Sequence, residues 1–112
     1  MKKFILLTAL IISPFTYAGG TSMPSVEPAM CIKKTYSWNT FIGFSWDGSD
    51  ECNEVVDKGY AKGVHYSGVF VSSNEEEIPL DGYITPYQSY EPSSIKGKEL
   101  KTLITSKIQW SN

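Results

Sequence analysis

The chain contains no arginine, and all ten of its basic residues are lysines. Bidentate recognition of guanine and planar pairing with phosphate both depend on the arginine guanidinium. The formal net charge of −2 also repels a phosphate backbone. The sequence therefore argues against nucleic acid as a partner.

Motifs for catalysis are equally scarce. His65 is the only imidazole, and it lies inside an expected strand without the orienting partner that a general base needs. The sequence has no P-loop, no GxSxG and no glycine-rich phosphate loop. Twelve acids allow glycosidase-type pairs, but the run 75–77 is typical of a solvated turn. We predict no catalytic residue.

No long apolar run is present either. Phe4–Ile12 is too short to span a bilayer, and it follows Lys2 and Lys3, as in a secretory signal peptide. Small residues end this segment at Ala18, which predicts a signal peptide over 1–18. An uncleaved anchor is the alternative. We expect an exported protein, in the periplasm or secreted, that does not span the membrane once the signal is removed.

The two cysteines, Cys31 and Cys52, allow a single intramolecular pairing. Disulfides form in exported proteins, and a loop of this length stabilises a small domain by roughly 3 kcal/mol. Two cysteines, one histidine and no CxxC make a poor metal set. The acids around Gly48 lack the spacing of an EF-hand. We predict a structural disulfide, no metal and no cofactor.

The length of 112 residues allows one domain. Residues 19–30 contain Gly-Gly and two prolines without periodicity, which predicts a flexible leader. Residues 31–112 form the expected domain. Its fold class is mainly β, a β-rich α+β arrangement with a small antiparallel sheet, one disulfide and one short helix.

Alternation of apolar and polar residues predicts several strands. The segments 31–36 and 38–46 are the first two, with Ile42, Phe44 and Trp46 on the apolar face of the second. A strand over 63–72 follows, in which Gly68 indicates a bulge or close packing. It forms a hairpin with a strand over 78–85.

The segment 50–58 is the one helix candidate. Ser49 suits the N-cap, acids occupy the first turn, and Gly59 suits the position after the C-cap. Cys52 and Val55 lie on one apolar stripe. A long irregular loop is the alternative.

The C-terminal third is less regular. Residues 86–97 contain two prolines and predict a loop. Residues 98–110 fit a helix or a strand, and their threonines and isoleucines favour the strand. In that strand Leu100, Ile104, Ile108 and Trp110 share one face.

Aromatic side chains are abundant, with seven tyrosines, three tryptophans and five phenylalanines. Tyrosine and tryptophan provide large contact areas at low entropic cost, so they are favoured at recognition surfaces. The alternative is that they pack around a small sheet. The candidate binding surface comprises Trp38, Tyr60, Tyr83, Tyr87 and Tyr90.

One part of the sequence resembles a MORN-type repeat, a glycine-punctuated β-hairpin module. The resemblance rests on Trp46-Asp47-Gly48, Cys52, the segment 59–63 and the segment 66–68, about a fifth of the chain in a single copy. Extra residues separate Gly48 from Cys52 and Cys52 from Gly59. The resemblance implies binding or scaffolding rather than catalysis.

Together these features predict a small exported, non-catalytic binding protein of the bacterial envelope or secreted space. An inhibitor or immunity-type role on a protein partner suits its size, acidity and disulfide. A carbohydrate-binding adhesin or toxin-associated subunit that uses the tyrosine-rich loop is the alternative. A small envelope hydrolase is the least favoured class.

Overall fold

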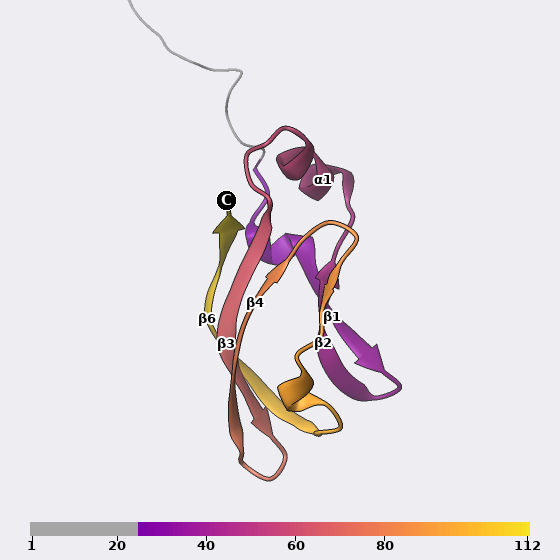
Figure 1. The fold of residues 1–112 in the computed structure, drawn as a ribbon, viewed down its shortest axis with the longest axis vertical. Coiled ribbons are helices and arrows are strands. Elements are labelled where there is room, and N and C mark those ends of the chain that lie inside the picture. Colours follow the sequence, from indigo (N-terminus) through magenta and orange to yellow (C-terminus); the bar gives the residue numbers. More distant parts are fainter. Residues whose placement is uncertain (1–24) are drawn as a thin grey trace, which may run out of the picture.

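The computed structural model describes residues 25–112. The predicted signal peptide at 1–18 and the first part of the leader lie outside these residues. Within the described range, six strands surround a shared core, with one α-helix and two 3-10 turns (Figure 1). No helix in this range has the length and apolarity needed to cross a membrane. The predicted mainly β fold class is confirmed.

The strands form two antiparallel sheets of three strands each. The first has the order β1-β2-β5, from β1 (Ile32–Ser37), β2 (Thr40–Trp46) and β5 (Ser89–Tyr90). The second has the order β4-β3-β6, from β4 (Glu77–Ile84), β3 (Gly63–Ser72) and β6 (Leu100–Ser111). The bounds of β3 and its hairpin with β4 confirm the sequence prediction.

The core lies where the inner faces of β2 and β3 meet. The Phe44 and Tyr66 rings lie 4.4 Å apart between centroids, and Phe41 stacks on Phe70 at 6.2 Å. All four side chains are buried. Such aromatic pairs add about 0.5–1.5 kcal/mol each beyond the area they bury, so they tie one sheet to the other.

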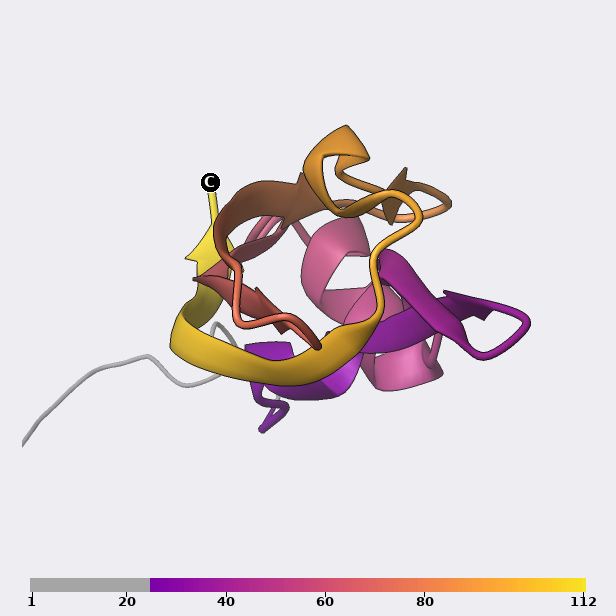
Figure 2. The same cartoon turned by 90° about the horizontal axis from the view of Figure 1, so that it is seen from below.

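The helix prediction is also confirmed. The helix α1 (Asp50–Asp57) begins at the N-cap Ser49, whose Oγ accepts a hydrogen bond from the Cys52 backbone N–H at 3.3 Å. It ends in a Schellman motif, in which the N–H groups of Gly59 and Tyr60 donate to the carbonyl oxygens of Val56 and Val55. Figures 1 and 2 show α1 covering one end of the space between the sheets.

The predicted disulfide joins Cys31 to Cys52, with a Cα–Cα distance of 5.5 Å. Both cysteines are fully buried. Cys31 ends a 3-10 turn, η3 (Pro28–Cys31), and the bond therefore fixes this turn to α1.

Part of the predicted flexible leader is folded. Within 19–30, residues 28–30 belong to η3, and Val26 is 9% exposed and packs in the core. The apolar Val26 side chain and the neighbouring disulfide hold this segment against the domain. The folded domain thus begins before Cys31.

The apolar face predicted for β2 is wrong at one position. Phe41 is 1% exposed, whereas Ile42 is only half-buried. Thr35 pairs with Gly43 and Tyr36 with Phe41, so Ile42 is an extra residue at a β-bulge. The bulge reverses the alternation and turns Phe41 inward.

The predicted apolar face of β6 is wrong at Ile104, because β6 has two register shifts of the same kind. The strand that the composition of 98–110 favoured is present as β6 (Leu100–Ser111), but Leu103 packs against the core and Ile104 is 52% exposed. The shifts lie opposite Ser67/Gly68 and Val71/Ser72 of β3. The predicted irregularity at Gly68 is confirmed, because an added Cβ there would lie 2.3 Å from the Ile104 carbonyl oxygen.

The predicted loop 86–97 contains β5 and a second 3-10 turn, η4 (Ser93–Ile95). Ile95 is 1% exposed. A single apolar side chain gives no periodicity, so the sequence pattern carried no signal for this contribution to the core.

Candidate functional site

Two of the five predicted aromatic residues are almost fully exposed, each at the tip of a turn. Trp38 is 97% exposed with φ 58°, and Tyr87 is 94% exposed with φ 65°. The left-handed region is uncommon for bulky residues and costs of order 1–3 kcal/mol. Trp38 occupies the first position of the two-residue turn between β1 and β2, where glycine is favoured in type II′ turns.

Tyr83 lies on the outer face of β4 and is 63% exposed. Its ring stacks on the His65 imidazole, with centroids 4.8 Å apart and planes 21° from parallel. The two residues are a cross-strand pair of β3 and β4. Tyr83 therefore belongs to a surface at the end of the sheet that leads into the turn of Tyr87.

Tyr90 has a structural role. Its hydroxyl oxygen accepts a hydrogen bond from the Asp81 N–H at 3.0 Å, and its ring lies directly against Gly82. Burial raises the pKa of Tyr90 above its usual value. Tyr60 follows α1, is half-buried and packs against the core.

The five predicted residues do not form one patch. The turn that contains Trp38 lies directly before Thr40, the first residue of β2. The carbonyl oxygen of Gln88, which follows Tyr87, accepts a hydrogen bond from the N–H of Trp46, the last residue of β2. At about 3.3 Å per residue, the two turns are separated by roughly 20–25 Å. Figure 1 shows the β1–β2 turn projecting away from the other strands, far from the turn that follows β4.

The prediction omitted three exposed apolar residues, Met30, Tyr36 and Ile104. Tyr36 is 53% exposed and contacts the edge of the Phe41 ring at 5.9 Å between centroids. In a strand with regular alternation, Tyr36 shares a face with Lys34, two residues earlier. This pattern could have placed Tyr36 on the inner face of β1. Ile104 could not have been found, because its exposure depends on the bulge in β6.

His65, Asp81 and Ser67 lie together on the outer face of the second sheet, but they do not form a catalytic triad. His65 Nε2 lies 2.6 Å from Asp81 Oδ1, and Ser67 Oγ lies 3.4 Å from the same nitrogen. A triad needs the carboxylate on one ring nitrogen and the nucleophile on the other. The imidazole here joins β3 to β4 across their pairing.

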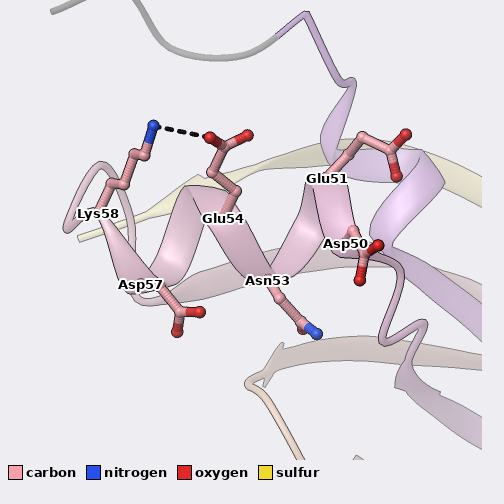
Figure 3. A pocket seen from close by; sticks show the side chains of 6 residues that line it. All are labelled: Asp50, Glu51, Asn53, Glu54, Asp57 and Lys58. Carbon is pink, nitrogen blue, oxygen red and sulfur yellow. Dashed lines mark ion pairs between the residues drawn. The ribbon is translucent and has the colours of Figure 1, made fainter.

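The helix α1 presents an acidic face, shown in Figure 3. Glu54 pairs with Lys58 at 2.7 Å, and a hydrogen bond from this pair raises the pKa of Lys58. Asp57 and Glu51 point in different directions from the helix (Figure 3). Over residues 25–112 no three His, Cys, Asp or Glu side chains are grouped so that they could hold a metal ion.

The architecture defines a class: two small antiparallel sheets around an aromatic core, one short helix and one disulfide. A solved structure with a similar fold is the solution structure of dispersin from enteroaggregative Escherichia coli, with a TM-score of 0.61 and 19% sequence identity. The match covers 85% of this chain and 96% of the dispersin chain. No family model matches the sequence. The likeness shows that this chain shares the dispersin fold.

Proposed function

We propose that this chain is an exported, non-catalytic binding protein that contacts a protein partner through the β1–β2 turn, with the Trp38 indole as its anchor. In this role the chain acts as an inhibitor or immunity-type protein in the bacterial envelope or secreted space. Bacterial origin is supported by the fold shared with a bacterial protein. The resemblance to a MORN-type module supports binding rather than catalysis.

The exposure and backbone of Trp38 carry the proposal. The indole gains nothing from packing because it is 97% exposed, and its φ of 58° is unfavourable for a bulky residue. Folding alone therefore gives no reason for tryptophan at this position. Tryptophan is the residue most enriched among the few that dominate binding energy at protein interfaces.

The shape of the turn favours a protein partner over a sugar. The β1–β2 turn, which contains Trp38, projects from the rest of the domain, as Figures 1 and 2 show from two directions. Sites for small ligands are concave, whereas interface anchors insert into a pocket of the partner. The half-exposed Tyr36, two residues earlier on β1, adds further aromatic area next to this tip.

The test is a pull-down with the mature protein from the envelope fraction of the producing bacterium, followed by calorimetry with each captured protein. We expect Trp38→Gly to weaken binding at least 30-fold, as expected for an anchor contributing about 2 kcal/mol or more. The fold should be kept, because relief of about 1–2 kcal/mol of strain offsets the entropy cost of glycine.

Tyr87→Gly is the matched control, since Tyr87 is also an exposed aromatic residue at positive φ. We expect it to leave affinity within about twofold. The acidic chain should also bind more weakly at high salt. If Tyr87→Gly abolishes binding, Trp38→Gly does not, and salt has no effect, the carbohydrate-binding alternative replaces the proposal.

A further inference from the structure

The space between the sheets has an open side and an opposite side on which strand contacts join the two sheets. β4 contacts both β5 and β2, which joins the sheets on that side. β1 and β6 are the edge strands on the open side. The turn η3 contacts β1, β6 and β3 there, so it bridges part of this open side.

A groove of about 220 Å³ lies on the open side, between β1 and β6. Its apolar lining comes from Ile32 of β1, Phe44 of β2, and Leu103 and Ile108 of β6. Ile32, Leu103 and Ile108 are only partly buried, although each packs against the core. The groove therefore exposes part of the hydrophobic core to solvent.

Tyr66 also lines the groove and has an unsatisfied hydroxyl. The residue is 1% exposed, and its OH has no hydrogen-bond partner among the described residues. An added Cβ on Gly68 would lie 2.9 Å from this OH, and Gly68 pairs with Thr105, another groove residue. A buried hydroxyl without a partner costs about 1–3 kcal/mol, and a ligand in the groove could supply the missing partner.

A lysine supplies charge at the same groove. Lys34 pairs with Phe44 across β1 and β2, so its side chain lies on the inner face and lines the groove. It is exposed and makes no ion pair with any residue from 25 to 112. Lys33 pairs with Ser45 and lies on the opposite face. The groove thus combines apolar walls with one exposed cation, and the unsatisfied Tyr66 hydroxyl is buried beside it.

The geometry points to a binding site for an amphiphilic anion, a medium-chain alkyl carboxylate. The carboxylate pairs with Lys34 and accepts a hydrogen bond from the Tyr66 hydroxyl, while the chain covers Ile32, Leu103 and Ile108. A methylene occupies roughly the volume of a water molecule, about 30 Å³. The groove therefore holds a chain of about seven carbons. This site is separate from the β1–β2 turn and does not depend on the proposed function.

The probe is sodium octanoate, titrated into 15N-labelled protein of residues 19–112 and followed by NMR. We expect saturable shifts in β1, β6 and Tyr66. Each buried methylene contributes about a factor of four, so hexanoate should bind about 15-fold more weakly. Octylamine, which has the same chain and the opposite charge, should cause no saturable shift.

Adjacent lysines give a matched pair of variants. Lys34→Gln should weaken octanoate binding about tenfold, whereas Lys33→Gln should change it less than twofold. Tyr66→Phe should weaken binding about fivefold and leave the Tm unchanged or higher, because it removes an unsatisfied hydroxyl. The Tm measurement separates loss of the ligand contact from loss of the fold.

Absence of saturable octanoate shifts would overturn the proposal. So would equal losses in the two lysine variants, or octylamine binding as tight as octanoate. N-acetyl-leucine tests the other source of this chemistry, the carboxyl end of a peptide. If it binds more tightly than octanoate, the groove receives a peptide end and the alkyl carboxylate assignment is wrong.

Discussion

Replacing Cys31 and Cys52 together by alanine should destabilise the domain by about 3 kcal/mol. The bond closes a loop with a sequence separation of 21 residues, for which the chain-entropy relation gives about 3 kcal/mol at room temperature. In a domain of this size, each kcal/mol lowers the Tm by about 4–8 °C. The expected fall in Tm is therefore about 12–24 °C.

The location of the bond explains why this loss should spread through the fold. Cys31 ends η3 and Cys52 lies in the first turn of α1, and both side chains are fully buried. Without the bond, no covalent link holds η3 to α1 at one end of the core. The double alanine variant avoids leaving a buried thiol, which a single substitution would do.

Thermal and urea unfolding followed by circular dichroism measure the effect. Wild-type protein treated with a reductant should unfold at the temperature of the double variant. Tyr87→Gly, at an exposed position, should differ from wild type by no more than about 0.5 kcal/mol. A double variant that unfolds within about 3 °C of wild type would refute the reasoning.

Three further substitutions test the local structure by urea unfolding. Ser49→Ala removes the N-cap of α1 and should cost about 1 kcal/mol; an unchanged midpoint would mean that the cap contributes nothing. Gly43→Ala places a Cβ 1.9 Å from the Tyr90 carbonyl oxygen at φ 151° and should cost at least about 2 kcal/mol, so a neutral result would contradict the bulge geometry. Tyr90→Phe removes the hydrogen bond from the Asp81 N–H and should cost about 1 kcal/mol at neutral pH. Because burial raises the pKa of Tyr90, the folded state keeps this proton above about pH 10 while the unfolded chain releases it; wild type should therefore lose stability through that range more steeply than Tyr90→Phe, and parallel curves would disprove the shift.

Local signals in the sequence predicted much of this fold. The alternation in β3 and the caps of α1 are properties of consecutive residues, and both elements appear as expected. The two cysteines could pair in only one way. These features depend little on what lies across the sheet.

Features set by pairing were not predictable. The inward turn of Phe41 and the exposure of Ile104 both follow from bulges, and a bulge depends on how two strands pair. The aromatic candidates were read as one surface because they are numerous. The strand topology separates Trp38 from Tyr87, and Tyr90 has a structural role in which it binds the Asp81 N–H.

The groove was hidden from the sequence for the same reason. Ile32 and Lys34 of β1 lie far along the chain from Leu103 and Ile108 of β6, and only the arrangement of the two sheets brings them together. The unsatisfied Tyr66 hydroxyl also has no local signature. The hydroxyl lies next to Gly68, and Gly68 pairs with Thr105 of β6, far along the chain.

The central claim, that Trp38 anchors a protein partner, is tested most directly by 19F NMR of protein containing 5-fluorotryptophan. Trp46 is buried and Trp110 partly buried, so Trp38 alone should show the full solvent isotope shift of an exposed indole. Its signal is assigned with Trp38→Phe. The account predicts that adding the captured partner moves this signal and removes its isotope shift, while the other two stay in place. A Trp38 signal that remains exposed in the saturated complex would contradict it.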